Sequence, residues 1–257
     1  LRGMWGKLCV GSSPTFSTVI FNNKRGKLDK YISIIIILFF NVLIGSAEEY
    51  VSVIQSYIDT GQYDKANEKY LSAIKEFDAN ASIYFAGGQV AIKLDKLDEA
   101  NKYIIKAIEL DNKNEEYRSV QEKLEKFKNL LTSARKTFDS GNIDDAIIDH
   151  EKIITSFPEH AIVYYNIGRI YKVNKEYDLA VLNYSKAGTL NPFEEKYGQA
   201  IIAIAQEMAN NGDIEYRRQE FDSAIEYYKS AIQYSPTYTT AIFKLARTYF
   251  KIKDYKN

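Results

Sequence analysis

The stretch FDSAIEYYKSAIQYSP, at positions 221–236, has the same pattern of small and large residues as YDLAVLNYSKAGTLNP at 177–192. In both, an aromatic residue stands three positions before an alanine, and a second alanine stands seven positions after the first. Residues at these spacings lie on one face of an α-helix, so each stretch predicts an amphipathic helix. The charged residues differ between the two stretches, which indicates that packing fixes one face and solvent leaves the other free to vary.

A repeat with this spacing runs through most of the chain. It is centred on five alanines, Ala66, Ala100, Ala146, Ala180 and Ala224. The residues twelve positions before them are small in four of the five cases, and are Ile54, Gly88, Ala134, Gly168 and Gly212. The residues sixteen positions before them are larger, and are Tyr50, Tyr84, Leu130, Tyr164 and Met208. Antiparallel helices joined by tight turns explain this alternation, because small residues let backbones approach and larger ones fill the space between helices.

This pattern resembles the tetratricopeptide repeat, whose period is about 34 residues. The resemblance implies an all-α fold, a right-handed superhelical solenoid of antiparallel helix pairs. The repeat units then lie near 47–80, 81–114, 127–160, 161–194 and 205–238, with a partial unit at 239–257. Some units depart from the family pattern: Thr137 and Glu215 replace the usual aromatic residue of the first helix, and His150 replaces that of the second.

Two intervals between units are longer than the repeat period. The five alanines are separated by 34, 46, 34 and 44 residues, so additional residues stand at about 115–126 and 195–204. Within 115–138 apolar residues follow one another at spacings of three and four, and are Tyr117, Val120, Leu124, Phe127, Leu131, Ala134 and Phe138. We expect two lengthened first helices. The apolar stripe has two interpretations: packing on the preceding helix pair, or self-association or partner binding through 115–138.

The first 47 residues differ in composition from the repeats. Lysine and arginine residues between positions 24 and 30 precede an apolar run at 31–44, and three small residues ending at Ala47 follow it. A basic stretch, a short apolar run and small residues before a cleavage site are typical of a secretory signal. We therefore predict a signal peptide at 28–47.

An uncleaved membrane anchor at 31–44 is the alternative, although these 14 residues are fewer than the ~20 that span a bilayer. In both cases we expect the repeat domain, 48–257, outside the cytoplasm, in the periplasm or secreted, because basic residues precede the apolar run and acidic residues follow it. We interpret residues 1–27 as an upstream segment outside the native protein.

The residues that catalysis or metal binding would require are scarce. Lysine and arginine number 34, as do aspartate and glutamate, and this balance argues against a dedicated nucleic-acid binder. The single cysteine is Cys9, and the two histidines are His150, at a packing position, and His160, in a turn where we expect it to be exposed. No cysteine and histidine cluster has the spacing of a zinc site. We predict no enzymatic activity, no cofactor and no metal.

In the family that the repeats resemble, the first helices of the units line a concave groove that receives an extended peptide or a partner's helix. By register, the second, fifth, sixth, ninth, twelfth and thirteenth residues of each unit should line it. Basic and acidic residues balance at these positions in the first three units, whereas the later units carry an excess of five positive charges, with Asp213 the one acidic residue counted. The candidate binding residues are Tyr165, Asn166, Arg169, Lys172, Asn210, Tyr216, Arg217, Phe243, Lys244, Arg247 and Lys251.

The expected function is that of a non-enzymatic scaffold that binds an acidic or carboxylate-ending peptide through these residues. An alternative is an accessory repeat module of a larger envelope protein with a catalytic or glycan-binding C-terminal region. The basic residues also have a purely structural interpretation, in which they balance acidic second helices. The sequence ends in KIKDYKN, where Lys253, Asp254 and Tyr255 match the turn before a second helix, so we expect the natural protein to continue beyond Asn257.

Overall fold

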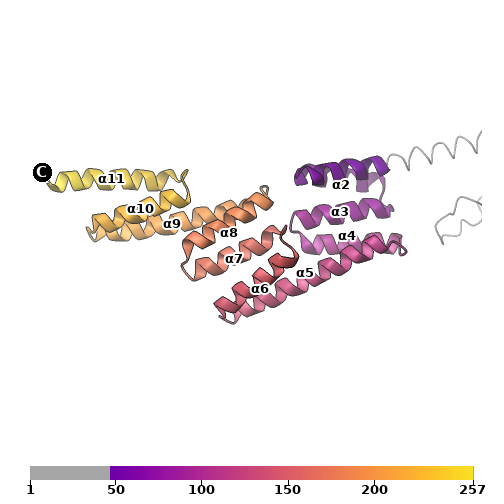
Figure 1. Cartoon of the computed structure of the whole chain (residues 1–257). Coiled ribbons are helices and arrows are strands. Elements are labelled where there is room, and N and C mark those ends of the chain that lie inside the picture. Colours follow the sequence, from indigo (N-terminus) through magenta and orange to yellow (C-terminus); the bar gives the residue numbers. More distant parts are fainter. Residues whose placement is uncertain (1–46, 257) are drawn as a thin grey trace, which may run out of the picture. The chain divides into compact units, whose positions relative to one another are not determined.

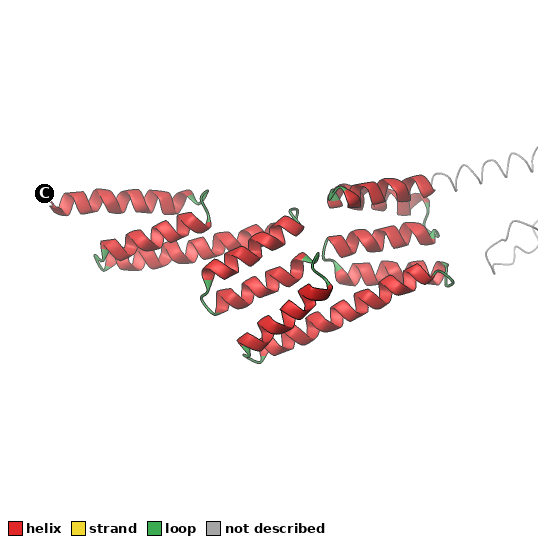
Figure 2. Cartoon of the chain, viewed as in Figure 1, coloured by secondary structure: helices red, strands yellow, loops and turns green. Residues whose placement is uncertain are grey.

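The computed structural model describes residues 47–256 of the chain, with the side chains described as far as Lys253 (Figure 1). In this range every regular element is an α-helix, as Figure 2 shows, which confirms the all-α prediction. The predictions for residues 1–27, and for all of the signal except Ala47, lie outside the described residues. None of the described helices is long and apolar enough to cross a membrane.

A first helix, described over residues 47–59, is followed by ten more. These are α2 (Tyr63–Glu76), α3 (Ala81–Lys93), α4 (Leu97–Leu110), α5 (Glu115–Asp139), α6 (Ile143–Ser156), α7 (Ala161–Val173), α8 (Tyr177–Leu190), α9 (Glu195–Arg217), α10 (Phe221–Tyr234) and α11 (Thr239–Lys256). Each helix packs on the next one along the chain. The helices α5 and α9, of 25 and 23 residues, are the two lengthened first helices that the sequence predicts.

The turn inside each unit has the same backbone conformation in five successive units. Five positions before each repeated alanine stands a residue with positive φ, and these are Gly61, Asp95, Gly141, Lys175 and Gln219. Glycine adopts this left-handed conformation without steric cost, whereas other residues lose about 1 kcal/mol. The packing of the second helix on the first must therefore hold the turn where glycine is absent.

Close contact between the two helices of a unit explains the alternation of small and large residues. The repeated alanines are fully buried, from Ala66 to Ala224. A Cβ atom added to Gly168 on α7 would lie 2.6 Å from Cδ1 of Tyr184 on α8, and one added to Gly212 would lie equally close to Tyr228. Glycine is thus required at these positions, because the tyrosine ring occupies the space of a side chain.

The apolar stripe of α5 is buried within the chain. Tyr117 stacks on Phe85 with ring centroids 4.4 Å apart, and Leu124 packs in a cluster with buried residues of α3 and α4. Further along the helix, Phe127 lies 5.0 Å from Phe157, which follows α6. The structure therefore supports the interpretation in which the stripe packs on the neighbouring repeat helices.

A buried polar contact joins units that are not adjacent in sequence. Asp95, in the turn between α3 and α4, accepts a hydrogen bond of 2.9 Å from the Tyr197 hydroxyl of α9, 102 residues away. The His160 ring, just before α7, lies 3.8 Å from the same carboxylate and stacks on Phe127 at 4.1 Å. The Asp95 side chain is 3% exposed. Burial, together with the charge of Asp95, raises the pKa of Tyr197.

Two local predictions are wrong. His160 is buried, at 7% exposure, because the Asp95 and Phe127 contacts enclose it. The expected turn at residues 253–255 is absent, and α11 continues to Lys256. Lysine prefers a helix to the left-handed turn conformation. The prediction that His150 is a packing residue is confirmed, since it is 2% exposed.

Candidate functional site

The candidate site is a cleft of about 410 Å³ between the first helices of two successive units, α5 and α7. Its lining residues come from four helices and are Leu131, Thr132, Arg135 and Phe138 of α5, His150 of α6, Ile162, Tyr165, Asn166, Arg169 and Ile170 of α7, and Lys196 of α9. A volume of this size suits a side chain and its flanking groups.

The repeat register accounts for most of this lining. The α5 residues are the fifth, sixth, ninth and twelfth of their unit, and Tyr165, Asn166 and Arg169 are the fifth, sixth and ninth of theirs. Three predicted residues thus meet in one cleft. The structure adds two cations, because Arg135 lies opposite them on α5 and Lys196 lies at the start of α9. Arg135 belongs to the first three units, whose predicted groove charges balance, and Lys196 stands in the added residues 195–204, outside the repeat register.

The three cations of the cleft differ in their existing partners. Arg135 lies 3.8 Å from Asp139 in an exposed pair on α5, and Lys196 lies 3.3 Å from Glu194. Exposed pairs of this kind contribute little free energy, so a stronger acidic ligand can replace them. Arg169 is exposed on α7 and lines the cleft. These side chains provide a basic rim.

Aromatic rings hold one wall of the cleft in place. Tyr165 lies 5.5 Å from Tyr184 and 5.4 Å from Tyr197 between ring centroids, so its ring is fixed by neighbours on α8 and α9. The Lys196 ammonium lies 5.8 Å from the Tyr165 ring centroid, within the range of a cation–π contact. The rigid ring gives an entering apolar group a fixed surface on which to pack.

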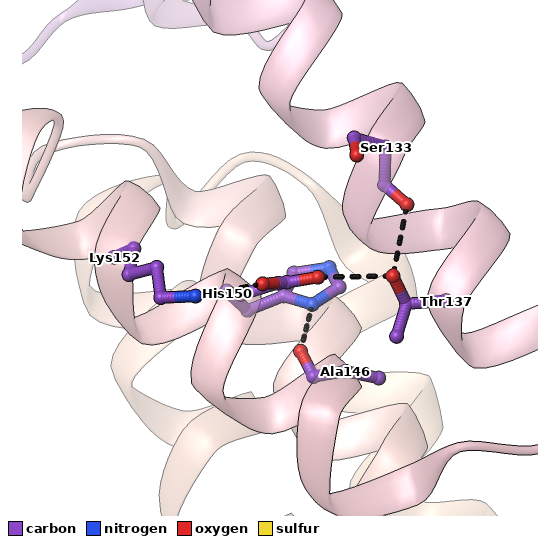
Figure 3. A network of polar contacts seen from close by, with 6 residues as sticks. Ser133, Thr137, Ala146, His150 and Lys152 are labelled. Atoms are coloured by element: carbon purple, nitrogen blue, oxygen red, sulfur yellow. Dashed lines mark hydrogen bonds and ion pairs between the residues drawn. The ribbon is translucent and has the colours of Figure 1, made fainter.

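His150 lies at the base of the cleft, within a polar network that Figure 3 shows. Its Nδ1 atom lies 2.7 Å from the Ala146 carbonyl oxygen, which can only accept, so Nδ1 carries the proton. Burial lowers the pKa of His150 and keeps the ring neutral near pH 7. Next to it, Lys152 and Thr137 donate hydrogen bonds to Asp149 and lower the pKa of that carboxyl. The Thr137 contact ties α5 to α6 beside the histidine.

Other predicted binding residues gather farther along the chain, around Asp213. Lys244 of α11 pairs with this carboxylate at 2.6 Å, and the Tyr228 hydroxyl donates to it at 2.8 Å. Burial acts to raise the pKa of Asp213, but these two hydrogen bonds lower it overall. Arg247 lies over the Tyr216 ring at 4.6 Å. Lys244 is therefore engaged in an ion pair that an acidic ligand would have to break.

The remaining predicted residues belong neither to the cleft nor to the cluster around Asp213. Lys172 lies 3.9 Å from Glu207 of α9, which also accepts a hydrogen bond of 2.6 Å from the Tyr177 hydroxyl. The charge balance of the later units omitted Glu207 and so overstated the positive excess. Four further candidates lie on α9 and α11. Asn210, Arg217 and Phe243 are exposed, and Lys251 is half-buried.

Among the described residues, no group of three or more histidine, cysteine, aspartate or glutamate side chains could hold a metal ion. The cleft is lined by a basic rim, aromatic side chains and one neutral imidazole.

Comparison with known proteins agrees with the helix pattern. Residues 81–114 and 161–194 match the family model described as tetratricopeptide repeat, and residues 212–253 match one described as TPR repeat. No curated protein matches the chain.

Solved structures that are similar to the chain include tetratricopeptide-repeat proteins at low identity. The P58(IPK) TPR domain is 13% identical, with 81% of this chain and 66% of that one covered and a TM-score of 0.39. MamA from Desulfovibrio magneticus RS-1 is 15% identical over 75% and 96% of the two chains, with a TM-score of 0.28. YrrB, described as a TPR protein with an unusual peptide-binding site, is 14% identical over 78% and 96%, also with a TM-score of 0.28. The three matched segments, at 81–114, 161–194 and 212–253, are therefore tetratricopeptide repeats.

Proposed function

We propose that the chain is a scaffold that binds an acidic peptide segment of a partner protein in the cleft between α5 and α7. Tetratricopeptide repeats generally mediate protein–protein interactions, and the fold is typically non-catalytic. The observation that carries the proposal is the pair Arg135 and Arg169, which line one cleft from facing helices. A guanidinium group binds a carboxylate through two parallel hydrogen bonds, so two such groups select for acidic side chains or a terminal carboxylate.

The proposed binding is electrostatic in part, which sets its expected strength. Hydrogen bonds to charged groups contribute about 1.5–3 kcal/mol when shielded from water and less at an exposed rim. Arg169 is exposed, so about 1–2 kcal/mol from its contact is a reasonable expectation, equivalent to about tenfold in affinity. Binding should weaken as salt increases, because ions screen the rim charges.

The test is a titration of the full chain against a fluorescent acidic peptide, read by anisotropy. The variant Arg169→Glu should weaken binding about tenfold. Arg118→Glu is the matched control, because Arg118 is exposed on α5 and does not line the cleft. Lys75→Glu on α2 is a second control. Equal affinities for the three variants would refute the proposal.

We also propose that the scaffold acts outside the cytoplasm, as a periplasmic, secreted or anchored protein. The apolar run at 31–44 and the small residues that follow it support this location. Mass spectrometry of the native N-terminus is the test. A mature protein that begins at residue 48 would support export, and one that retains Trp5 would contradict both the signal and the assignment of residues 1–27.

A further inference from the structure

The repeat unit that contributes His150 differs from two later units in the pair of residues that its helices bring together. In two later units, a glycine on the first helix faces a tyrosine sixteen positions later on the second, as Gly168 faces Tyr184. The unit of α5 and α6 has Ala134 and His150 at the equivalent positions. An imidazole is smaller than a phenol ring, and the alanine adds only a methyl group on the other side. The ring on the second helix of this unit is therefore shorter than the tyrosine ring of the two later units.

The cleft reaches the His150 position of this unit. His150 is its one lining residue from a second helix, since the others belong to α5, α7 and α9. The base of the cleft thus reaches beyond the layer of first helices to α6. In the later unit of α9 and α10, the tyrosine in the same position, Tyr228, directs its hydroxyl to Asp213 on the first helix. In that unit a phenol group spans from one helix layer to the other, opposite Gly212.

His150 carries an unused hydrogen-bond acceptor at this point. Its side chain is buried, with the residue 2% exposed, and Nε2 has no protein partner. Because Nδ1 donates to the Ala146 carbonyl, the neutral ring presents a lone pair on Nε2. A buried acceptor without a donor is unfavourable, so a ligand that brings an O–H or N–H group to this atom gains free energy that other ligands do not.

We propose that the cleft receives a tyrosine side chain of the bound acidic segment, with the tyrosine hydroxyl donating to Nε2 of His150. The proposal rests on the function proposed above and specifies the sequence that the site selects. Phe138 and Tyr165 provide apolar walls for the ring, and carboxylates on either side of the tyrosine reach Arg135 and Arg169. Nε2 is closed to solvent, so the side chains at the rim rotate as the ring enters.

Two capped tripeptides test the proposal with the full chain, acetyl-Glu-Tyr-Glu-amide and acetyl-Glu-Phe-Glu-amide. They differ by one hydroxyl group, so charge and ring size are matched. The tyrosine peptide should bind about threefold to tenfold more tightly, as expected for one additional hydrogen bond at a buried acceptor. Nitrogen-15 labelling of histidine gives a direct reading, because the chain has only two histidines and His160 serves as the internal reference. The Nε2 resonance of His150 should shift with the tyrosine peptide and not with the phenylalanine peptide.

The double variant Ala134→Gly with His150→Tyr restores the residue pair of the later units and removes the Nε2 acceptor. It should bind the two peptides with equal affinity while keeping the basic rim. It also assigns the His150 resonance, which disappears.

The outcomes separate this inference from the proposed function. Equal binding of both peptides to the unaltered chain, with no shift at His150, overturns the inference and leaves the function standing if Arg169→Glu still weakens binding. That result would also be expected if a buried water held Nε2. If neither peptide binds and acidic peptides in general do not, the function and the inference both fail.

Discussion

The substitution Gly168→Ala tests the packing rule on which the fold depends. Gly168 lies inside α7, and an added Cβ would lie 2.6 Å and 2.7 Å from two atoms of the Tyr184 ring and 3.1 Å from the Ala180 carbonyl oxygen. The ring has little freedom to move, because Tyr184 is 2% exposed and packs against Tyr165. The methyl group must therefore push the two helices apart or force the tyrosine from its rotamer.

The magnitude follows from two opposing effects. Alanine has a higher helix propensity than glycine by about 1 kcal/mol, which favours the variant. Overpacking a well-packed interior costs about 1–3 kcal/mol, and the contact with a backbone oxygen favours the upper part of that range. The expected net loss is about 1–2 kcal/mol. Gly198→Ala is the matched control, because a Cβ there on α9 meets nothing within 4 Å, and the variant should gain about 0.5–1 kcal/mol.

Thermal unfolding followed by circular dichroism at 222 nm compares the variants. The melting temperature should fall by roughly 2–8 °C for Gly168→Ala and rise by a few degrees for Gly198→Ala. Because repeat proteins open locally, hydrogen exchange should increase most in α7 and α8. If both variants were stabilised equally, glycine would not be required by helix contact and the packing account would be refuted.

Two further predictions concern the buried tyrosines. Tyr197→Phe removes the hydroxyl that donates to Asp95, so the free energy of unfolding should fall by about 1–3 kcal/mol and amide hydrogen exchange should speed up at the start of α9. The control Tyr227→Phe, at an exposed tyrosine, should leave the stability unchanged. Equal stabilities of the two variants would show that the Tyr197–Asp95 contact is unimportant. Burial raises the pKa of Tyr177 and Tyr184 to about 12, against about 10 in the unfolded chain. Above pH 10 the folded chain therefore binds more protons than the unfolded chain, so the stability that these tyrosines contribute is fully present below pH 10 and decreases as the pH rises above it. Absorbance at 295 nm and circular dichroism should therefore change together, and titration of all tyrosines near pH 10 with intact helices would contradict this.

The helix pairs could be predicted from sequence because the contacts that form them are local. Ala180 and Gly168 each pack within one unit, and twelve residues separate them in sequence, so the spacing of small residues carries the packing directly. The burial of His160 could not be predicted in this way. Its enclosure depends on Asp95, in the turn of the preceding unit, and on Phe127, and the spacing of small residues carries no signal for these contacts.

The cleft could be predicted only in part. The repeat register identified Tyr165, Asn166 and Arg169, but the division of the chain into a neutral and a basic half separated them from Arg135. Lys196 lies in the added residues of α9, outside the family register, and Glu207 is the third residue of its unit, a position that the register does not assign to the groove. The departure of His150 from the family pattern was the available signal for the base of the cleft, and it was interpreted as packing alone.

The most direct test of the central claim is to locate a bound acidic peptide on the full chain. A Glu-rich peptide that carries a benzophenone group can be cross-linked by light and the modified residues identified by mass spectrometry. The account predicts adducts within 131–138 of α5 and 162–169 of α7, and their loss on Arg169→Glu. Adducts confined to α8, α10 or α11 would contradict the proposal that the segment lies between α5 and α7.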